Sequence, residues 1–351
     1  MPTYYDGTKL LSMLDINGNK PEIFICTGNR TSGKTTYFNR MVVNGFIKKN
    51  RKFILLYRFI QELDNVEEKF FKDIGSLFFN DYVFTAKKRS KTPFVHLFLQ
   101  HKSQEEAVNC GYAIALNGAD TIKKNSHLFS DCACILFDEF QSETNNYCSD
   151  EMAKFHSIHT SLARGQGKQV KYLPVYMLSN CVSILNPYFV ALGISNRIKS
   201  DTKFLKGDGY VLEQSYNESA AEAQKESAFN RAFSNSDYLA YSSQNVYLQD
   251  NTAFISSMKG KSKYICTLKC DGQHYALREF TDEGIIYCDD RPDMTFRGKI
   301  AVTTDDHNIN YVMLKRNELF FINMRYLFDN GCFRFKNLQC KDAVLKALIH
   351  V

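Results

Sequence analysis

The chain has 351 residues, 44% of them hydrophobic and 14% aromatic, enough for the core of one large domain or two ordinary ones. Its 44 basic and 38 acidic side chains give a net charge of +6, a mild excess that fits a polyanionic partner but is far below that of a histone-like protein. The N-terminus MPTYYDGTKLL has no basic segment followed by an apolar run, and no stretch approaches the roughly 18 apolar residues of a membrane helix. We therefore expect a soluble protein with no membrane partner that stays where it is made.

The 11 cysteines are scattered along the chain, several within apolar runs, as is typical of small buried hydrophobes in a reducing compartment. Cys132-x-Cys134 and Cys266-x3-Cys270 lack the paired two-residue spacing of a zinc site, and the eight histidines show no ligand spacing. We interpret the cysteines as structural.

Over the first two hundred residues, apolar runs alternate with longer helical segments, which predicts a mostly parallel sheet covered by helices. The predicted strands span residues 22–28, 52–59, 82–86, 94–100, 111–116, 133–140 and 172–179. The predicted helices span residues 35–48, 61–79 and 149–164. Ser149 can cap the last helix and Gly165 can end it.

The composition changes twice in the second half of the chain. Residues 213–245 are polar, rich in alanine and serine and poor in β-branched residues, which predicts short helices forming a linker. After residue 246, KSKYICTLKCDGQHYALREF, EGIIYCDD and GKIAVTTDD predict hairpin-connected strands with an Asp-Gly turn, followed by a helix in KDAVLKALI. The sequence therefore predicts an α/β domain over 1–212, a helical linker over 213–245 and a small α+β domain over 246–351.

Residues 28–36 read GNRTSGKTT and contain the full phosphate-loop pattern between a predicted strand and a predicted helix. Glycines allow backbone N–H groups to turn toward phosphates, and the helix N-terminus adds partial positive charge. Lys34 would reach the β- and γ-phosphates, and the Thr35 hydroxyl would hold Mg²⁺. The predicted nucleotide-binding residues are Gly28, Asn29, Arg30, Thr31, Ser32, Gly33, Lys34, Thr35 and Thr36.

A second motif, ACILFDEF, places two acids at the end of a buried strand, where ligands bind in open α/β sheets. Asp138 is suited to the Mg²⁺ shell as the Walker B aspartate, and Glu139 to be the general base for an attacking water. This acidic pair, and the absence of a guanine-reading Asn-Lys-x-Asp, separate the chain from small GTPases. The motif predicts ATP hydrolysis, and Glu139 argues against a regulatory module that only binds nucleotide.

Three further features each have two interpretations. Ser179 and Asn180 end the strand in YLPVYMLSNC, where they either sense the γ-phosphate or its water, or cap the helix that begins near Pro187. Arg164 closes a helix beside a glycine-rich turn, and is either an arginine finger for a neighbour's site or a side chain that complements the helix dipole. Arg30, inside the phosphate loop, either contacts phosphate in cis or lines the mouth of the site.

Two basic runs, residues 87–91 and 123–124, are predicted to lie in loops between strands. Solvated loops are the default interpretation, and contact with a phosphate backbone is the sharper one. We favour the first run for DNA contact, through Lys87, Lys88, Arg89 and Lys91.

The order GNRTSGKTT, FDEF and LSNCVSILNPYF resembles the DNA-encapsidation ATPases of small podophages, which package a unit-length genome carrying covalent terminal protein. The likeness is firmest over residues 20–200 and includes the arginine within the phosphate loop. The resemblance implies a P-loop ATPase of the additional-strand, catalytic-glutamate (ASCE, RecA-like) class that uses ATP and Mg²⁺. Carried over by motif, Lys34 and Thr35 bind nucleotide and Mg²⁺, Asp138 holds Mg²⁺ and Glu139 is the base. Arg164 matches the trans finger by position.

The resemblance also implies the partners. Such proteins form homo-oligomeric rings, expected to be pentameric, that act in the host cytoplasm while docked on the portal of an empty capsid. They thread double-stranded DNA inward at the expense of ATP, and a structural RNA can be part of the docking site.

The C-terminal domain is where relatives of such motors diverge, because large terminases carry an RNase-H-like nuclease there, with clustered acids that bind two metals. This chain has acids near predicted strand ends at Asp271, Asp289, Asp290, Asp305 and Asp306. Asp271 lies in the expected turn, and a protein that packages unit-length DNA has nothing to cut. We favour a vestigial nuclease fold kept for nucleic-acid or portal contact. A terminase-type protein with an active metal-dependent endonuclease is the alternative.

Overall fold

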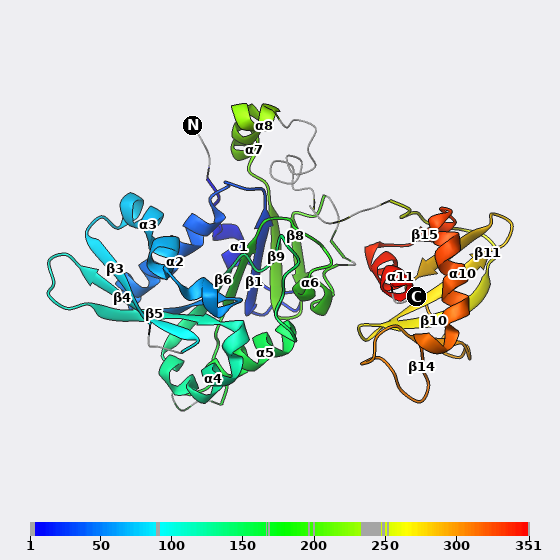
Figure 1. Ribbon diagram of the computed structural model, residues 1–351. Coiled ribbons are helices and arrows are strands. Elements are labelled where there is room, and N and C mark those ends of the chain that lie inside the picture. The colour runs from blue at the N-terminus through cyan, green and yellow to red at the C-terminus, as the bar shows by residue number, and fades with distance from the viewer. Residues whose placement is uncertain are drawn as a thin grey trace. The chain divides into compact units, whose positions relative to one another are not determined.

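The computed structural model describes residues 4–88, 92–165, 167, 169–195, 197–198, 201–232, 247, 250 and 253–349. The chain divides into two compact units, Met1–Gln249 and Asp250–Val351 (Figure 1). None of the helices among these residues combines the length and apolarity needed to traverse a bilayer.

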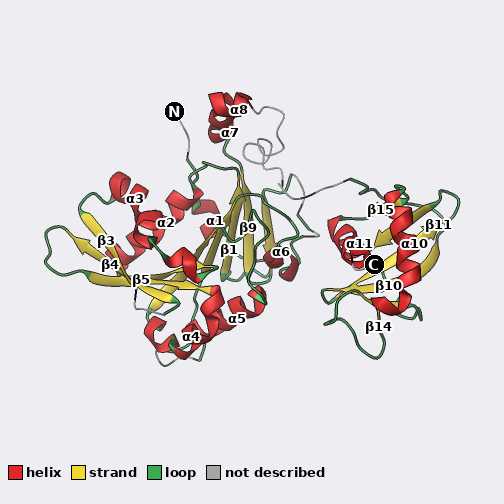
Figure 2. Ribbon diagram, in the orientation of Figure 1, coloured by secondary structure: helices red, strands yellow, loops and turns green. Residues whose placement is uncertain are grey.

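The first unit is built on a nine-stranded sheet (Figure 2). Its strands are β1 (Ile23–Gly28), β2 (Lys52–Tyr57), β3 (Tyr82–Lys88), β4 (Phe94–His101), β5 (Val108–Ala115), β6 (Cys132–Asp138), β7 (Val175–Ser179), β8 (Phe204–Gly207) and β9 (Tyr210–Ser215). They lie in the order β3-β4-β5-β2-β6-β7-β1-β9-β8. The six strands from β5 to β9 in this order run parallel, and antiparallel pairing occurs only toward the two edges. The predicted α/β fold with a mostly parallel sheet is confirmed.

Helices cover both faces of this sheet, because its central strands are apolar on both sides. One face packs against α1 (Thr8–Ser12), α2 (Lys34–Lys49) and α3 (Val66–Phe78). The other packs against α4 (Ala119–Lys124), α5 (Glu151–Leu162) and α6 (Pro187–Ala191). Three short 3₁₀ turns, η1 (Ile60–Leu63), η2 (Leu116–Gly118) and η3 (Ser126–Phe129), join these elements.

Several local predictions need correction. The helix predicted over 61–79 is η1 followed by α3, because Asn65 adopts a left-handed conformation between them. Ser149 does not cap α5: the N-cap is Asp150, and the Glu151 carboxylate accepts a hydrogen bond from the Cys148 N–H instead.

The two basic runs were also misplaced. Lys87 and Lys88 belong to β3, an edge strand, and residues 123–124 end α4, so neither pair lies in a loop. Arg89 and Lys91 lie outside the described residues.

The predicted linker begins too early. Residue 213 lies within β9, which pairs with β1 along its whole length and continues to Ser215. Two helices, α7 (Glu218–Glu226) and α8 (Ala228–Ala232), then follow as predicted, and Asn217 caps α7 by accepting a hydrogen bond from the Ala220 N–H. Both helices fall in the first compact unit, whose boundary lies after residue 249.

The second unit has a six-stranded sheet in the order β14-β13-β10-β11-β12-β15. Its strands are β10 (Lys263–Cys270), β11 (Gln273–Phe280), β12 (Ile285–Asp289), β13 (Lys299–Ala301), β14 (Val312–Met313) and β15 (Phe333–Phe335). Asp271 and Gly272 both have positive φ in the β10–β11 turn, as expected for the Asp-Gly hairpin. β10, β11 and β12 form an antiparallel meander, β13 and β14 continue the sheet in parallel beyond β10, and β15 pairs in parallel with β12.

The core of the second unit lies between this sheet and two helices, α10 (Glu318–Asp329) and α11 (Leu338–Ile349). A short 3₁₀ turn, η4 (Leu314–Asn317), precedes α10. The sequence analysis predicted α11 but not α10, whose apolar residues occur on more than one face: Phe321 and Met324 are buried, while Leu319 and Tyr326 are exposed.

Candidate active site

The phosphate loop joins the end of β1 to the start of α2, as its motif predicts. A Cβ at Gly28 would lie 2.4 Å from the Ser215 carbonyl oxygen, and Gly33 has a φ of +93°, so the backbone requires glycine at both positions. Asn29 is buried and exchanges two hydrogen bonds with the main chain of Asn217, at 2.9 and 3.0 Å. The loop is therefore held in shape before any phosphate arrives.

Lys34 is a buried cation, and no carboxylate among the described residues lies within salt-bridge distance of it. Its Nζ donates to the Asn29 carbonyl oxygen at 2.8 Å and to Ser32 Oγ at 3.1 Å, which uses two of its three donors. Burial lowers the pKa of this ammonium group. An arriving phosphate would restore the missing countercharge.

The strand order places the acidic pair beside the phosphate loop. β6 carries Asp138 at its carboxyl end and is separated from β1 only by β7. Thr35 and Asp138 line the same two cavities, and the Thr35 side chain favours the charged form of the Asp138 carboxyl. Burial, with a smaller contribution from Glu139, raises the pKa of Asp138 to about 6. β7 is thus the additional strand that the ASCE class requires between the phosphate-loop strand and the Walker B strand.

Glu139 leaves the strand in a left-handed conformation, with a φ of 55°. Its N–H donates to Asp138 Oδ1 at 3.0 Å, and its side chain is exposed. The next residue, Phe140, is fully buried, and its N–H donates to the Leu178 carbonyl oxygen at 3.1 Å. This sharp turn directs the Glu139 carboxylate into open space beside Asp138.

The structure separates the two interpretations of the residues that end β7. The cap of α6 is Asn186, whose side chain accepts from the Phe189 N–H, so neither Ser179 nor Asn180 caps that helix. Ser179 Oγ is buried and has no hydrogen-bond partner among the described residues. An unpaired buried hydroxyl is costly, and Ser179 is one of the residues that line the cavity described next.

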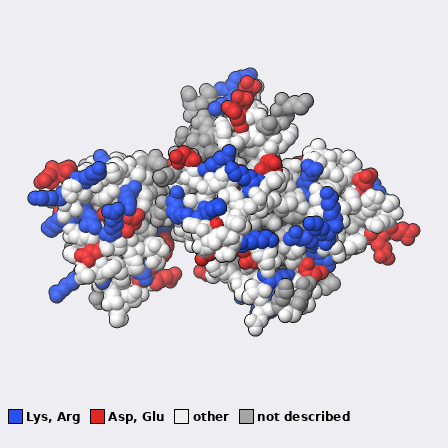
Figure 3. Space-filling model, turned by 180° about the vertical axis from the view of Figure 1, so that it is seen from behind, with Lys and Arg blue, Asp and Glu red and all other residues white. Residues whose placement is uncertain are grey.

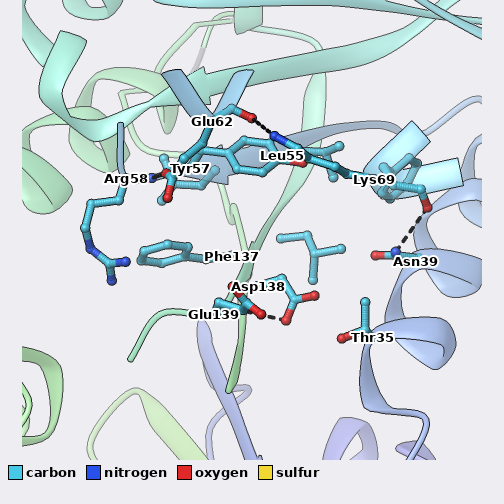
Figure 4. A pocket seen from close by; sticks show the side chains of 13 residues that line it. Thr35, Asn39, Leu55, Tyr57, Arg58, Glu62, Lys69, Phe137, Asp138 and Glu139 are labelled. Atoms are coloured by element: carbon cyan, nitrogen blue, oxygen red, sulfur yellow. Dashed lines mark hydrogen bonds between the residues drawn. The ribbon is translucent and has the colours of Figure 1, made fainter. Parts of the chain in front are cut away.

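One cavity of about 850 Å³ brings the predicted residues together. Residues 30–36 of the phosphate loop line it, with Asp138, Glu139, Ser179 and Asn180. A neighbouring cavity of about 440 Å³ shares Thr35, Asp138 and Glu139 with the first (Figure 4). The acidic pair therefore lies between a space large enough for a nucleotide and a second opening toward solvent.

Other residues that line the larger cavity carry no motif. They are Tyr4, Tyr5, Tyr37, Arg40, Leu77, Phe78, Gln224 and Asn230. Arg40 lies 4.3 Å from the centre of the Phe78 ring. These side chains come from four separate segments, so only the fold could reveal them.

Arg30 lines the same cavity and forms an ion pair with Glu143. Glu143 follows the Walker B strand by five residues, so the ion pair connects the phosphate loop with the segment after the acidic pair. Of the two interpretations of Arg30, the position at the mouth of the site is the one that this geometry supports.

Two groups of predicted residues lie outside the cavities. Arg164 is exposed beyond the end of α5, where its Nη2 lies 3.4 Å from Ser161 Oγ. Lys88 pairs with Asp64 at 2.7 Å, and Lys87 lies 5.0 Å from the centre of the Phe98 ring. Figure 3 shows basic side chains on the visible side of each unit, with acidic ones among them.

The acids of the second unit do not form a comparable site. Asp271 pairs with Lys346 and Asp289 with Arg278, at 2.7 and 2.8 Å, and Asp290 pairs with Lys336. Asp306 accepts hydrogen bonds from the Gly272 N–H and Thr303 Oγ1. Across the described residues of the chain, no group of three or more His, Cys, Asp or Glu is arranged to hold a metal ion.

The chain is similar to known proteins. A family model for the podovirus DNA encapsidation protein (Gp16) matches residues 2–349. The chain belongs to this family. Membership confirms the resemblance drawn from the phosphate loop, FDEF and LSNCVSILNPYF, and with it a role in phage genome encapsidation.

Individual relatives cover nearly the whole chain. The DNA packaging protein of Bacillus phage phi29 is 24% identical over 338 residues, 95% of this chain and 93% of that protein. The DNA packaging protein of Bacillus phage B103 is 25% identical over 317 residues, 88% of this chain and 91% of that protein.

Solved structures show the same fold. A chain of the bacteriophage Phi-29 viral genome packaging motor assembly matches with a TM-score of 0.69 at 22% identity, over 99% of this chain and 97% of that one. A chain of the Phi-28 gp11 DNA packaging motor matches with a TM-score of 0.57 at 16% identity, over 99% of this chain and 98% of that one.

Proposed function

We propose that this encapsidation protein is a DNA-translocating ATPase, which uses ATP hydrolysis to drive double-stranded DNA through the portal into an empty capsid. The observation that carries the proposal is the single cavity that joins the phosphate loop, the adjacent acids Asp138 and Glu139, and the unpaired Ser179 hydroxyl. Membership of the DNA encapsidation family indicates that the cargo is DNA and that the protein acts during encapsidation of the phage genome.

The residues present fit a nucleotide-bound Mg²⁺ ion. Thr35 Oγ1 and the Asp138 carboxylate are hard oxygen donors, and both residues line the same cavity. Burial raises the pKa of the Asp138 carboxyl, and a bound cation would favour its charged form. When bound, Mg²⁺ would neutralise charge on the β- and γ-phosphates.

The protein's own residues would then carry out hydrolysis. Lys34 and the backbone N–H groups of the loop hold the phosphates, and Glu139 accepts a proton from the water that attacks the γ-phosphorus. The bond between the γ-phosphorus and the bridging oxygen breaks, and ADP and inorganic phosphate leave. The proton that Glu139 accepted from water is then released to the products or to solvent. Ser179 Oγ and Asn180 would hydrogen-bond the γ-phosphate or this water, which makes the end of β7 sensitive to the nucleotide state.

We assign Arg164 a role in the active site of the neighbouring subunit in a ring. We expect this ring to be a pentamer. The side chain is exposed at the end of a well-packed helix and lines neither cavity of its own subunit, which suits a finger that acts in trans. Lys87 and Lys88, on an edge strand, remain our candidates for the DNA backbone. The second unit, in which Asp271, Asp289 and Asp290 are held in ion pairs, is proposed as a vestigial nuclease that contacts nucleic acid, the portal or a structural RNA.

The test of this proposal mixes two inactive variants. Lys34→Ala removes phosphate binding but keeps Arg164, and Arg164→Ala keeps an intact site but offers no finger. Mixed rings should recover part of the ATPase activity and of the DNA packaging into empty capsids, because some interfaces pair an intact site with an intact finger. Absence of recovery from variants that fold and associate would contradict the trans finger. Turnover by Lys34→Ala alone would contradict the site itself.

A further inference from the structure

A buried ion pair lies beside the end of the Walker B strand. Arg58 Nε is 3.0 Å from Glu151 Oε2, and the two side chains are only 7% and 2% exposed. The Glu151 carboxylate also accepts hydrogen bonds from the Tyr188 hydroxyl, at 2.7 Å, and from the Cys148 N–H, at 2.8 Å. The carboxylate is thus satisfied by groups from the end of β2, the segment before α5, and α6.

The same guanidinium group fixes the main chain next to Glu139. Arg58 Nη2 donates to the Phe140 carbonyl oxygen at 2.7 Å, extending past the ring of Phe137 to reach it (Figure 4). Because the Phe140 N–H is bonded to β7, both backbone polar groups of Phe140 are held. A non-glycine residue keeps a left-handed conformation only where its surroundings impose it, and Phe140 is the residue through which they act on Glu139.

The other end of the ion pair is the start of α5. Glu151 is the first residue of this 12-residue helix, which is about 18 Å long. Phe155, Ile158 and Leu162 bury its inner face, so it behaves as one rigid element. Arg164 follows two residues after its last residue. One end of α5 therefore meets the subunit's own catalytic turn, and the other carries the arginine that we assign to the neighbour.

We propose that Arg58 and Glu151 are positioning residues that connect the catalytic carboxylate of one subunit with the arginine that this subunit presents to the next. The proposal rests on the trans role of Arg164. Apolar side chains of similar volume would fill this space with equal or greater stability, whereas the ion pair and its hydrogen bonds also fix direction. A shift of the turn at residues 138–140 on phosphate binding or release is passed through Arg58 and Glu151 to α5, and so to Arg164.

The first arm of the test measures the subunit's own site. Glu151→Gln keeps the size of the side chain and removes its charge. We expect binding of a fluorescent ATP analogue to be unchanged, because the phosphate loop is untouched, while kcat falls about 10- to 100-fold because Glu139 is misplaced. A merely structural role would lower binding and turnover together. Unchanged kcat in the folded variant would overturn the proposal.

Two further variants support this measurement, one as a control and one as a substitute. Asp131→Asn is the matched control, because the Lys52–Asp131 pair, at 2.6 Å, joins the same strands β2 and β6 at their opposite ends, and it should change neither quantity. If Glu151→Gln does not fold, Arg58→Lys takes its place, since lysine keeps the charge but has no planar fork to reach Glu151 and Phe140 together.

The second arm measures the neighbour's site in mixed rings. Glu151→Gln is added to the Lys34→Ala subunit, whose own site is already inactive, so only the presentation of Arg164 can change. Recovery of activity with Arg164→Ala partners should fall about tenfold or more below that given by Lys34→Ala alone. Equal recovery from both donors would overturn the link while leaving the trans finger intact. No recovery from either donor would reject the finger and the link together.

Discussion

Both units carry carboxylates at strand ends, but the two sets are in opposite physical states. In the first unit, Asp138 has a raised pKa, Glu139 is exposed on a strained turn, and Lys34 is buried with no carboxylate partner in the part of the chain that the structure describes. In the second unit, Asp271 and Asp289 are each neutralised by a lysine or an arginine. Charges left uncompensated around a cavity indicate a site that awaits a charged ligand, whereas charges paired with one another indicate a structure that is already complete.

The sharpest way to break this comparison is to neutralise one acid in each unit. Glu139→Gln should lower ATP turnover by about 10²- to 10⁴-fold, because it removes the group that accepts the proton from water. Binding of ATP should persist, since the phosphate loop is unchanged. Steady-state turnover and equilibrium binding of a fluorescent ATP analogue measure the two effects separately. Turnover that survives in Glu139→Gln would identify the protein as a nucleotide-binding module with another base or none.

Asp289→Asn is the partner variant in the second unit. It breaks the ion pair with Arg278 and should leave ATP turnover intact when measured without DNA or capsids. Plasmid incubated with the unaltered protein and Mn²⁺ should remain uncut. Nicking that disappears in Asp289→Asn would show that the second unit is an active nuclease after all.

A second prediction concerns Asp138 and the sign of its pKa shift. Its pKa is about 6 in the folded protein, above the ordinary value of 3.8, so the folded state holds this proton more tightly than the unfolded chain does. Protonation of Asp138 therefore contributes to the free energy of unfolding. This contribution is fully present below pH 4 and is lost as the pH rises through about 6. Without Mg²⁺, Asp138→Asn should therefore be more stable than the unaltered protein at pH 7, by about 3 kcal/mol.

Denaturant unfolding at a series of pH values tests this. The difference between Asp138→Asn and the unaltered protein should shrink toward zero as the pH falls from 7 to about 4. Added Mg²⁺ and ATP should reverse the order at neutral pH, because only the unaltered protein keeps the carboxylate that fits the ion. A stability difference between the two proteins that does not vary with pH would mean that ionisation of Asp138 does not destabilise the folded protein.

The contrast between the units also shows what could be predicted from the sequence. The phosphate loop and FDEF are local motifs whose chemistry depends on adjacent residues, so their roles and the parallel sheet between them were accessible. The partners of Arg58 were not, because Glu151 lies 93 positions away and only the strand order brings them together. The only sequence signal for a role of Arg58 is its position as a charged residue at the end of the apolar run KFILLYR.

Predictions failed where local preference competes with packing. Residues 213–215 are polar and were assigned to a linker, yet they complete β9 because β1 offers a full row of backbone partners. Lys87 and Lys88 were assigned to a loop, but an edge strand accepts lysine readily, and charge there protects the edge from further pairing.

The smallest expected effect concerns Ser179, and it tests whether an unpaired polar group is a functional feature. Ser179→Ala removes a buried hydroxyl without a partner, so the free energy of unfolding of the nucleotide-free protein should stay the same or rise by up to about 1 kcal/mol. Turnover should fall about tenfold, the cost of one hydrogen bond to a charged phosphate or its water.

Thr27 provides the control, because it lies opposite Ser179 in the β1–β7 register. Its hydroxyl is also buried and has no hydrogen-bond partner among the described residues, but Thr27 does not line the cavity. Thr27→Val should give the same gain in stability with no loss of turnover. Equal losses from both variants would mean that the end of β7 matters for packing rather than for sensing phosphate.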